Sequence, residues 1–300
     1  MPFYNPQMLL SRILLAFAAL TWGASFVATK ICLGYLSPVE LMAFRLIIGL
    51  PVLFILILVN RVKFNLGDNK LSILLASLIM LAHFFIQITG IKYTTATNTG
   101  WIISIIPLIV MVMAILFLKE KIHFSMILGI SLATLGVIFL ISKGKISDIS
   151  WLRSTGDWLV LASAHTWALY TIVSRKISRT IDPLLLTFVV LLPSAICSTG
   201  IVLASSNLTV LINLPFNIFI ALLFLGVITT AISHWFWQRG VASLGASKAG
   251  IFLYLEPFAT TAIAVPLLHE AFGPFTALGA VLVLSGVLLG QRNPRNIIID

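Results

Sequence analysis

The residue with the clearest chemical potential is a glutamate inside a long apolar run. Glu256 stands beside Pro257, between apolar stretches of the chain. A charged side chain at membrane depth costs ~2.5 kcal/mol or more, so residues of this kind are usually functional. Glu256 is suited to binding a substrate amine or to carrying a proton. The structural alternative is a protonated carboxyl that hydrogen-bonds a carbonyl left free by Pro257; we favour the functional interpretation.

Other polar and aromatic residues occur at helical spacing within apolar segments. His83 and Gln87 are four residues apart, as are His234 and Gln238, so each pair shares a helix face. Each pair indicates either the lining of a polar cavity or hydrogen bonds between helices. The predicted substrate-binding residues are Glu256, Tyr254, His83, Gln87, Asn98, Trp101, Trp22, Trp167, Tyr170 and His234.

Two tryptophans and one arginine fall in the middle of apolar runs. Tryptophan usually lies at the interface between membrane and water, so the central positions of Trp22 and Trp167 favour a role in walling a cavity. Arg45 needs a partner at such a depth, and Glu40 is a nearby carboxylate. We favour a structural interpretation of Arg45, in which its side chain extends outward to the membrane surface.

The sequence lacks the patterns that are typical of enzymes. It has no HExxH motif, no P-loop pattern and no cluster of Asp or His residues. Cys32 and Cys197 lack the spacing of metal ligands and do not form a disulfide framework. We therefore predict no catalytic residue, no metal, no cofactor and no enzymatic function. A membrane-embedded enzyme and a lipid flippase stay open as alternatives.

The elements that must position these residues are membrane-spanning helices. Hydrophobic residues make up 60% of the 300 positions and charged residues 9%, whereas a soluble domain carries about 25% charged residues. One span needs roughly 20 apolar residues. We predict an all-α integral membrane protein with spans at 11–33, 37–59, 71–91, 97–118, 123–142, 157–176, 183–205, 216–238, 246–268 and 274–291.

The net charge of +10 is interpreted as a signal of topology. The basic residues lie between apolar runs, so we expect no binding of nucleic acid. Placing the N-terminus in the cytoplasm puts most Lys and Arg residues on the cytoplasmic side, as membrane proteins prefer. Both termini are therefore expected to be cytoplasmic. The first ten residues have no charged region and no cleavage site, so we expect no cleaved signal peptide.

An internal repeat divides the chain into two units, at 11–142 and 157–291. A shift of 150 residues aligns 87–140 with the second half, and a shift of 145 aligns the first two spans of each half. Each unit holds five spans, an odd number, so the second copy must be inverted in the membrane. Inverted repeats are typical of secondary transporters, whose sites lie between the repeats near the midplane. Matched pairs include Trp22/Trp167, Pro38/Pro183, Gly90/Gly240, Gly100/Gly250, Pro107/Pro257 and Glu120/Glu270.

Repeated residues at helix ends and on helix faces are interpreted as structural. Lys30 and Arg175 occupy equivalent positions and are expected to be anchors at the membrane interface. Glu120 and Glu270 are expected to cap the helices that follow them. Four glycines should allow close packing of helices within the fold, with dimerisation as the alternative; they are Gly129, Gly136, Gly279 and Gly286.

The order of these motifs resembles the EamA type of the drug/metabolite transporter superfamily, over about 12–291. The resemblance implies ten helices, cytoplasmic termini and a central cavity lined by helices 1, 3, 4, 6, 8 and 9. It also implies movement, often export, of amino acids or other small metabolites. Val190 stands where a second arginine would match Arg45. The motifs are Trp22-Gly23-Ala24-Ser25-Phe26 with Lys30, Ser37-Pro38, Phe44-Arg45-Leu46, Leu118-Lys119-Glu120 and Leu268-His269-Glu270.

The resemblance and the repeat together lead to one functional expectation. We expect a secondary transporter, acting as an exporter of small metabolites in a bacterial inner membrane. Its partners would be a small-molecule substrate and the lipid bilayer, with protons as a candidate coupling ion. The oligomeric state is open between monomer and dimer.

Overall fold

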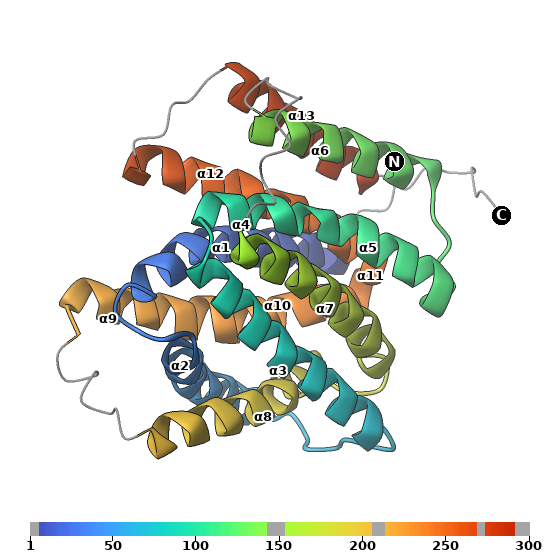
Figure 1. Ribbon diagram of the computed structural model, residues 1–300. Coiled ribbons are helices and arrows are strands. Elements are labelled where there is room, and N and C mark those ends of the chain that lie inside the picture. Colours follow the sequence, from blue (N-terminus) through green and yellow to red (C-terminus); the bar gives the residue numbers. More distant parts are fainter. Residues whose placement is uncertain (1–5, 143–153, 206–213, 269–273, 292–300) are drawn as a thin grey trace.

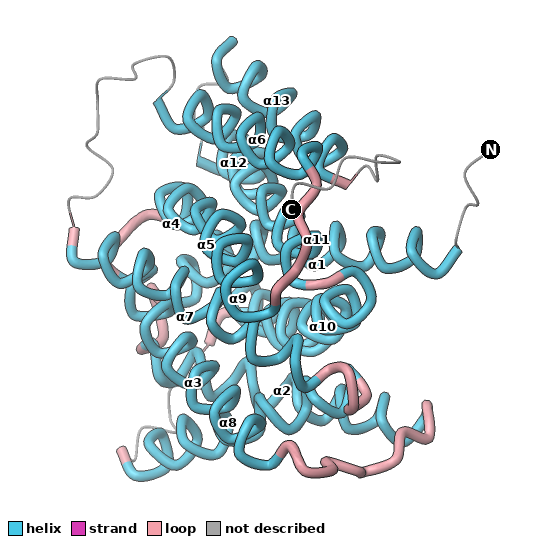
Figure 2. Tube along the Cα trace, turned by 90° about the vertical axis from the view of Figure 1, so that its right-hand side faces the viewer, coloured by secondary structure: helices cyan, strands magenta, loops and turns pink. Residues whose placement is uncertain are grey.

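The structure is a computed structural model that describes residues 6–142, 154–205, 214–268 and 274–291. These residues form helices and short connections, without a β-strand (Figure 1; Figure 2). The helices are α1 (Pro6–Cys32), α2 (Pro38–Val59), α3 (Lys70–Lys92), α4 (Ala96–Ile102), α5 (Ile106–Met113), α6 (Phe124–Ser142), α7 (Thr155–Ile177), α8 (Pro183–Ala204), α9 (Phe216–Leu223), α10 (Ser233–Leu244), α11 (Ala246–Gly250), α12 (Leu255–Leu268) and α13 (Pro274–Gly290).

Several of these helices have the length and composition of membrane spans. Within the described residues, six helical segments meet both criteria: Pro6–Cys32, Pro38–Val59, Lys70–Lys92, Ala96–Leu118, Pro183–Ala204 and Phe216–Leu244. Two shorter apolar helical stretches cover Phe124–Phe139 and Ala277–Gly290. Large apolar side chains such as Leu71, Phe216 and Leu288 are more than two-thirds exposed on the outside of the bundle. A surface of this kind is stable against lipid rather than water.

The helix starts follow from local sequence chemistry. Ser37 precedes α2 and accepts a hydrogen bond from the Glu40 amide at 3.3 Å, while the Glu40 carboxylate accepts one from the Ser37 amide at 2.7 Å. Asp182 precedes α8 and accepts from the Leu184 amide at 2.8 Å. A proline follows each cap, where its missing N–H loses no hydrogen bond. The predicted spans at 37–59 and 183–205 begin at or directly after these two caps.

Helices of the two halves pack against each other in matched pairs. At one side of the bundle α6 lies against α13, and at the opposite side α2 lies against α8 (Figure 1). Between them, α1 packs against α10 and α12, while α7 packs against α3 and α5. The α1 contacts and the α7 contacts correspond under the sequence repeat. Each half therefore supplies the other half with neighbours of the same kind.

The pairing of α6 with α13 depends on glycines. A methyl group built at Gly129 would lie 2.5 Å from the amide nitrogen of Gly290 and 2.6 Å from the carbonyl oxygen of Gly286. One built at Gly136 would lie 2.7 Å from the carbonyl oxygen of Gly279. The two backbones thus touch along an antiparallel contact, since low numbers on α6 meet high numbers on α13. The four glycines pack helices within the chain, as the sequence predicts.

Charged side chains satisfy helix ends far away in the sequence. Lys30 donates to the carbonyls of Ile91 and Lys92, at 3.0 and 2.9 Å, where α3 ends. Arg175 donates to the carbonyl of Val241 at 3.0 Å, where α10 ends. The last carbonyls of a helix have no partner within it and attract cations. Lys30 and Arg175 are repeat equivalents that serve equivalent helix ends.

The expected role of Glu120 is wrong in one respect. Its carboxylate does not cap the helix that follows it. It accepts hydrogen bonds from the amides of Ala246 and Ser247, at 2.9 and 3.0 Å, and so caps α11 in the other half. The first N–H groups of α11 lie at this carboxylate and are its partners. Glu270 lies outside the described residues.

We predict that Gly129→Ala destabilises the protein, whereas Gly200→Ala does not. The added methyl group at Gly129 meets backbone atoms that cannot move aside, and such overpacking costs about 1–3 kcal/mol. Gly200 has no atom within 4 Å of the same position, so alanine there should be neutral or stabilising through its helix propensity. Thermal unfolding in detergent measures both variants. Equal melting temperatures for the two would contradict the close α6–α13 contact.

Candidate functional site

A cavity lies inside the bundle, among helices from both halves. The empty space there, including its opening to solvent, is about 500 Å³. It runs from Glu256 on α12 toward Thr29 and Ile91, beside the helix end that Lys30 caps. Its lining comprises Trp22, Ser25, Phe26, Thr29, Arg45, His83, Phe84, Gln87, Ile88, Ile91, Ile106, Trp167, His234 and Glu256.

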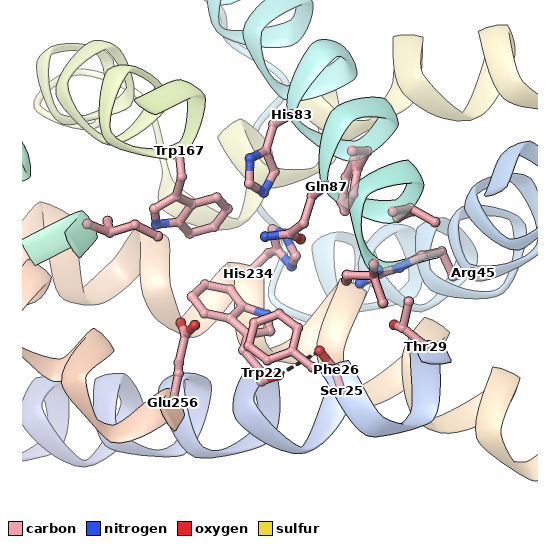
Figure 3. A pocket seen from close by; sticks show the side chains of 14 residues that line it. Trp22, Ser25, Phe26, Thr29, Arg45, His83, Gln87, Trp167, His234 and Glu256 are labelled. Carbon is pink, nitrogen blue, oxygen red and sulfur yellow. Dashed lines mark hydrogen bonds between the residues drawn. The ribbon is translucent and has the colours of Figure 1, made fainter. Parts of the chain in front are cut away.

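The structure brings six of the ten predicted site residues to this cavity. Figure 3 shows their side chains gathered around one space, although they come from α1, α3, α7, α10 and α12. Their contact with a substrate stays a prediction. The six are Trp22, His83, Gln87, Trp167, His234 and Glu256.

The other four predicted residues do not line the cavity, and three of them join helices to each other. The Tyr254 hydroxyl hydrogen-bonds that of Thr134 at 2.8 Å. The Tyr170 hydroxyl donates to the Gln238 side chain at 3.3 Å. Asn98 donates to Asp157 at 2.5 Å. The fourth residue, Trp101, is half-buried at the end of α4.

Aromatic rings form a rigid wall at the centre of the cavity. Trp22 and Trp167, which are repeat equivalents, meet edge to face with their ring centroids 4.9 Å apart. The His234 ring lies 5.1 Å from Trp22, and the His83 ring lies 5.1 Å from Trp167. The Trp22 indole also donates to the Thr229 carbonyl at 3.1 Å. Edge-to-face contacts of this kind stabilise buried rings in one arrangement.

Hydrogen bonds assign the tautomers of the two cavity histidines. Nδ1 of His234 lies 2.7 Å from the Thr229 carbonyl oxygen, and Nδ1 of His83 lies 3.1 Å from that of Ser163. A carbonyl oxygen only accepts, so Nδ1 carries the hydrogen in both rings. Nε2 of each neutral ring is then an acceptor, and it has no partner within the described residues. Both histidines can therefore accept a hydrogen bond from a ligand.

Glu256 is the acidic residue that lines the cavity. Its side chain is buried, and the carboxylate has no hydrogen-bond or ion-pair partner in the described part of the chain. The Thr260 hydroxyl donates to the carbonyls of Gly23 and Glu256, both at 2.9 Å, and so joins α12 to α1 at this point. The structural alternative, a carboxyl group bonded to a free carbonyl, is not what the structure shows. Glu256 is held in place by its backbone while its acidic group faces the cavity (Figure 3).

Arg45 is the main functional candidate that the sequence interpretation missed. Its side chain does not extend outward but is buried and lines the cavity. Its Nε donates to Thr230 at 2.8 Å and its Nη2 to Thr229 at 3.2 Å. The guanidinium also lies 5.0 Å from the centre of the Phe84 ring, within the range of a cation–π contact. The signal in the sequence was an intramembrane charge without a second copy in the repeat.

A local irregularity positions the two threonines that hold Arg45. The segment Phe224–Ile232 between α9 and α10 forms π-helical turns, which are frequent at functional sites. Gly49 and Gly226 let α2 approach this segment closely, since a methyl group at Gly49 would lie 2.7 Å from the Gly226 carbonyl oxygen. Both features bring Arg45 to its partners.

Comparison with known proteins places the chain in a family. The EamA-like transporter family matches residues 9–142 and 154–290, which is most of the chain in two copies of the same unit. The chain belongs to the EamA-like transporter family. With its apolar helices, this EamA-like protein is an integral membrane protein.

Relatives and a solved structure are similar over nearly the whole chain. An uncharacterized transporter, YyaM, of Bacillus subtilis (strain 168) is 30% identical over 283 residues, covering 92% of this chain and 91% of its own. An uncharacterized transporter of Archaeoglobus fulgidus is 27% identical over 282 residues, covering 93% and 96%. A crystal structure with 18% identity superposes with a TM-score of 0.72 and covers 94% of this chain and 96% of its own, which shows a shared fold.

The described residues hold no group of three or more His, Cys, Asp or Glu side chains placed to bind a metal ion. The described residues that line the cavity offer one carboxylate, one guanidinium, two imidazole acceptors, an amide and aromatic faces.

We predict that water reaches the cavity at Thr29 but does not reach its repeat equivalent, Ser174. Both side chains are buried, but Thr29 lines the cavity, whereas Ser174 does not and donates to the Thr171 carbonyl at 3.2 Å. In a background with Cys32 and Cys197 replaced by Ser, a Thr29→Cys variant should react with a small charged thiol reagent about tenfold faster than Ser174→Cys, because a reagent that enters the cavity reaches position 29 and not position 174. Equal rates would contradict a cavity that reaches Thr29 and does not reach Ser174.

Proposed function

We propose that this EamA-like protein is a secondary transporter that exports small zwitterionic metabolites, such as amino acids, through the cavity between its two halves. The observation that supports this best is a pair of opposite charges in one cavity. Glu256 and Arg45 lie on opposite sides of the Trp22 side chain (Figure 3), and no ion pair joins them in the described structure. Buried charges without a counter-charge are costly, so a ligand with both charges complements this site.

The two charged groups suit the two ends of a zwitterion. A substrate ammonium would bind the Glu256 carboxylate and the faces of Trp22 and Trp167, which attract cations. A substrate carboxylate would bind the Arg45 guanidinium, whose Nη1 has no hydrogen-bond partner among the described residues. The imidazole acceptors of His83 and His234 add specificity for N–H groups.

We further propose ten membrane spans arranged as two inverted repeats. Lys30 and Arg175 support this arrangement, because equivalent cations cap equivalent helix ends in the two halves. Arg12 donates to the Gln291 carbonyl at 3.1 Å, which places the start of α1 and the end of α13 at one end of the bundle. That contact supports an even number of crossings. The Lys and Arg distribution supports a cytoplasmic position for this end, and the membrane that we propose is a bacterial inner membrane.

Transport would follow from exchange between the two equivalent halves. The cavity extends toward the end that holds Lys30, while the Trp237 ring packs against Trp22 and Trp167, at 5.6 and 5.7 Å, on the Arg175 side. We infer from this asymmetry that the cavity faces away from the cytoplasm in this state. Swapping the contacts of the two halves would close that path and open the other.

No comparable observation supports the two alternatives, a lipid flippase and a membrane-embedded enzyme. A flippase needs a lateral opening into the cavity, but the apolar groove between α2, α8 and α9 shares no lining residue with it. Relatives named as transporters favour transport over catalysis. We therefore propose a function that is not enzymatic.

We predict that Glu256→Ala weakens transport by about tenfold or more, because it removes the carboxylate that binds the substrate cation in a low-dielectric site. The measurement is counterflow of labelled amino acids and related metabolites in liposomes that contain the purified protein. Ile106→Leu is the matched control, since Ile106 is the repeat equivalent of Glu256 and lines the same cavity. If Glu256→Ala leaves counterflow unchanged, Glu256 does not bind the substrate.

We predict that protons drive the transport and that Glu256 carries them. An imposed pH gradient should then stimulate uptake by the wild type and have no effect on Glu256→Gln, which cannot release a proton. His83→Gln and His234→Gln test the two other titratable groups of the cavity, and His165→Gln, on an exposed side chain, is the control. The same response to pH in all three cavity variants as in the wild type would reject proton coupling through this site.

A further inference from the structure

A second cavity lies at the end of the bundle where Arg175 caps α10. It is enclosed by the turn at 119–123, the end of α7, the junction of α10 with α11 and the end of α13, toward the right of Figure 1. Its empty space, including the opening, is about 560 Å³, and it shares no lining residue with the central cavity. No step of the proposed transport uses it.

The lining of this second cavity is strongly basic. Four side chains that carry or can carry positive charge line it: Lys121, His123, Arg175 and Lys248. Among the described residues of the lining, Glu120 is the one acidic residue. Its carboxylate accepts from the amides of Ala246 and Ser247 and lies 4.0 Å from Nε of Arg175. Basic groups gathered at partly buried helix ends favour an anionic ligand.

A buried hydroxyl gives an independent indication of a ligand. Ser247 lines the same cavity with 3% of its surface exposed, and its Oγ has no hydrogen-bond partner in the described structure. Buried polar groups are almost always hydrogen-bonded. An oxygen-rich ligand in the cavity would accept a hydrogen bond from this hydroxyl.

We propose that the second cavity binds a phosphate group, carried either by an anionic phospholipid or by a soluble phosphate. A phosphate presents several acceptor oxygens, which match ammonium and hydroxyl donors that converge from different helices. Basic pockets between membrane helices bind anionic lipid headgroups in this way. The position at the helix ends, beside the apolar side chains of Met126 and Leu244, fits a headgroup at the membrane surface.

A bound phosphate would join the two halves of the chain. Lys121 follows the last helix turn before α6 in the first half, and Ser247 and Lys248 belong to α11 in the second. A ligand held by both would add to the contacts of Glu120 at the same place. Occupation should therefore stabilise the closed arrangement at this end of the bundle.

The test uses the purified full chain in nanodiscs of phosphatidylcholine, with increasing fractions of phosphatidylglycerol, and follows the melting temperature. A second arm titrates inorganic phosphate against chloride at equal ionic strength in neutral detergent. Stabilisation by the lipid alone identifies a headgroup site, and stabilisation by phosphate identifies a soluble ligand. Both results support the proposal, and stabilisation by neither overturns it.

Variants decide whether the effect comes from this cavity. The double variant Lys121→Gln/Lys248→Gln should lower the affinity for the stabilising ligand by about 25-fold, since each basic residue near an anionic surface contributes about fivefold to the affinity. Lys63→Gln, an exposed lysine outside the cavity, should change the affinity by less than about twofold on the same basis. Ser247→Ala removes one donor without changing charge and should also weaken binding, which keeps the test valid if the double variant fails to fold. Wild-type affinity in both cavity variants would overturn the proposal.

Discussion

The fold depends on satisfying the free N–H and C=O groups at the ends of its helices. The hydrocarbon of the bilayer offers these groups no hydrogen bonds, so side chains of the protein supply partners where the helices end at its edge. Lys30, Arg175 and Glu120 do this for α3, α10 and α11, each from a distant part of the sequence. These side chains therefore satisfy the backbone and also fix which helices are neighbours.

This arrangement leads directly to the geometry of the central cavity. With Lys30 bound at the end of α3, the polar face of α3 that carries His83 and Gln87 is held against α1 and Trp22. The Thr260 hydroxyl joins α12 to α1 at Gly23, which brings Glu256 to the opposite wall. These helix ends thus have side-chain partners, whereas groups at the centre keep unpaired acceptors and donors among the described residues. The groups that can bind a ligand therefore lie where the two halves meet.

Local chemistry made part of this predictable from sequence. Apolar runs, the Ser37 and Asp182 caps and the glycine pairs define helices and contacts through neighbouring residues. Glu256 and Trp22 were predictable because their types are unusual at that depth. Arg45 was not, because its partners Thr229 and Thr230 lie 184 and 185 residues away and are aligned by π-helical turns. The same limit applies to Glu120, whose target is set by packing of the halves.

The residues that hold the helices together are repeated in the two halves, but the two charged groups of the candidate site are not. Lys30 matches Arg175 and Trp22 matches Trp167, whereas Ile106 stands opposite Glu256 in the repeat although both line the same cavity. Under the inverted repeat that we propose, the contacts between helices must be equivalent in both halves, because each half takes the other's place when the cavity changes sides. The ligand does not change, so one carboxylate and one guanidinium suffice at the centre. A second copy of either would add a buried charge without a counter-charge, which is costly at this depth. The contacts between helices and the charges of the candidate site therefore depend on different residues of the same helices.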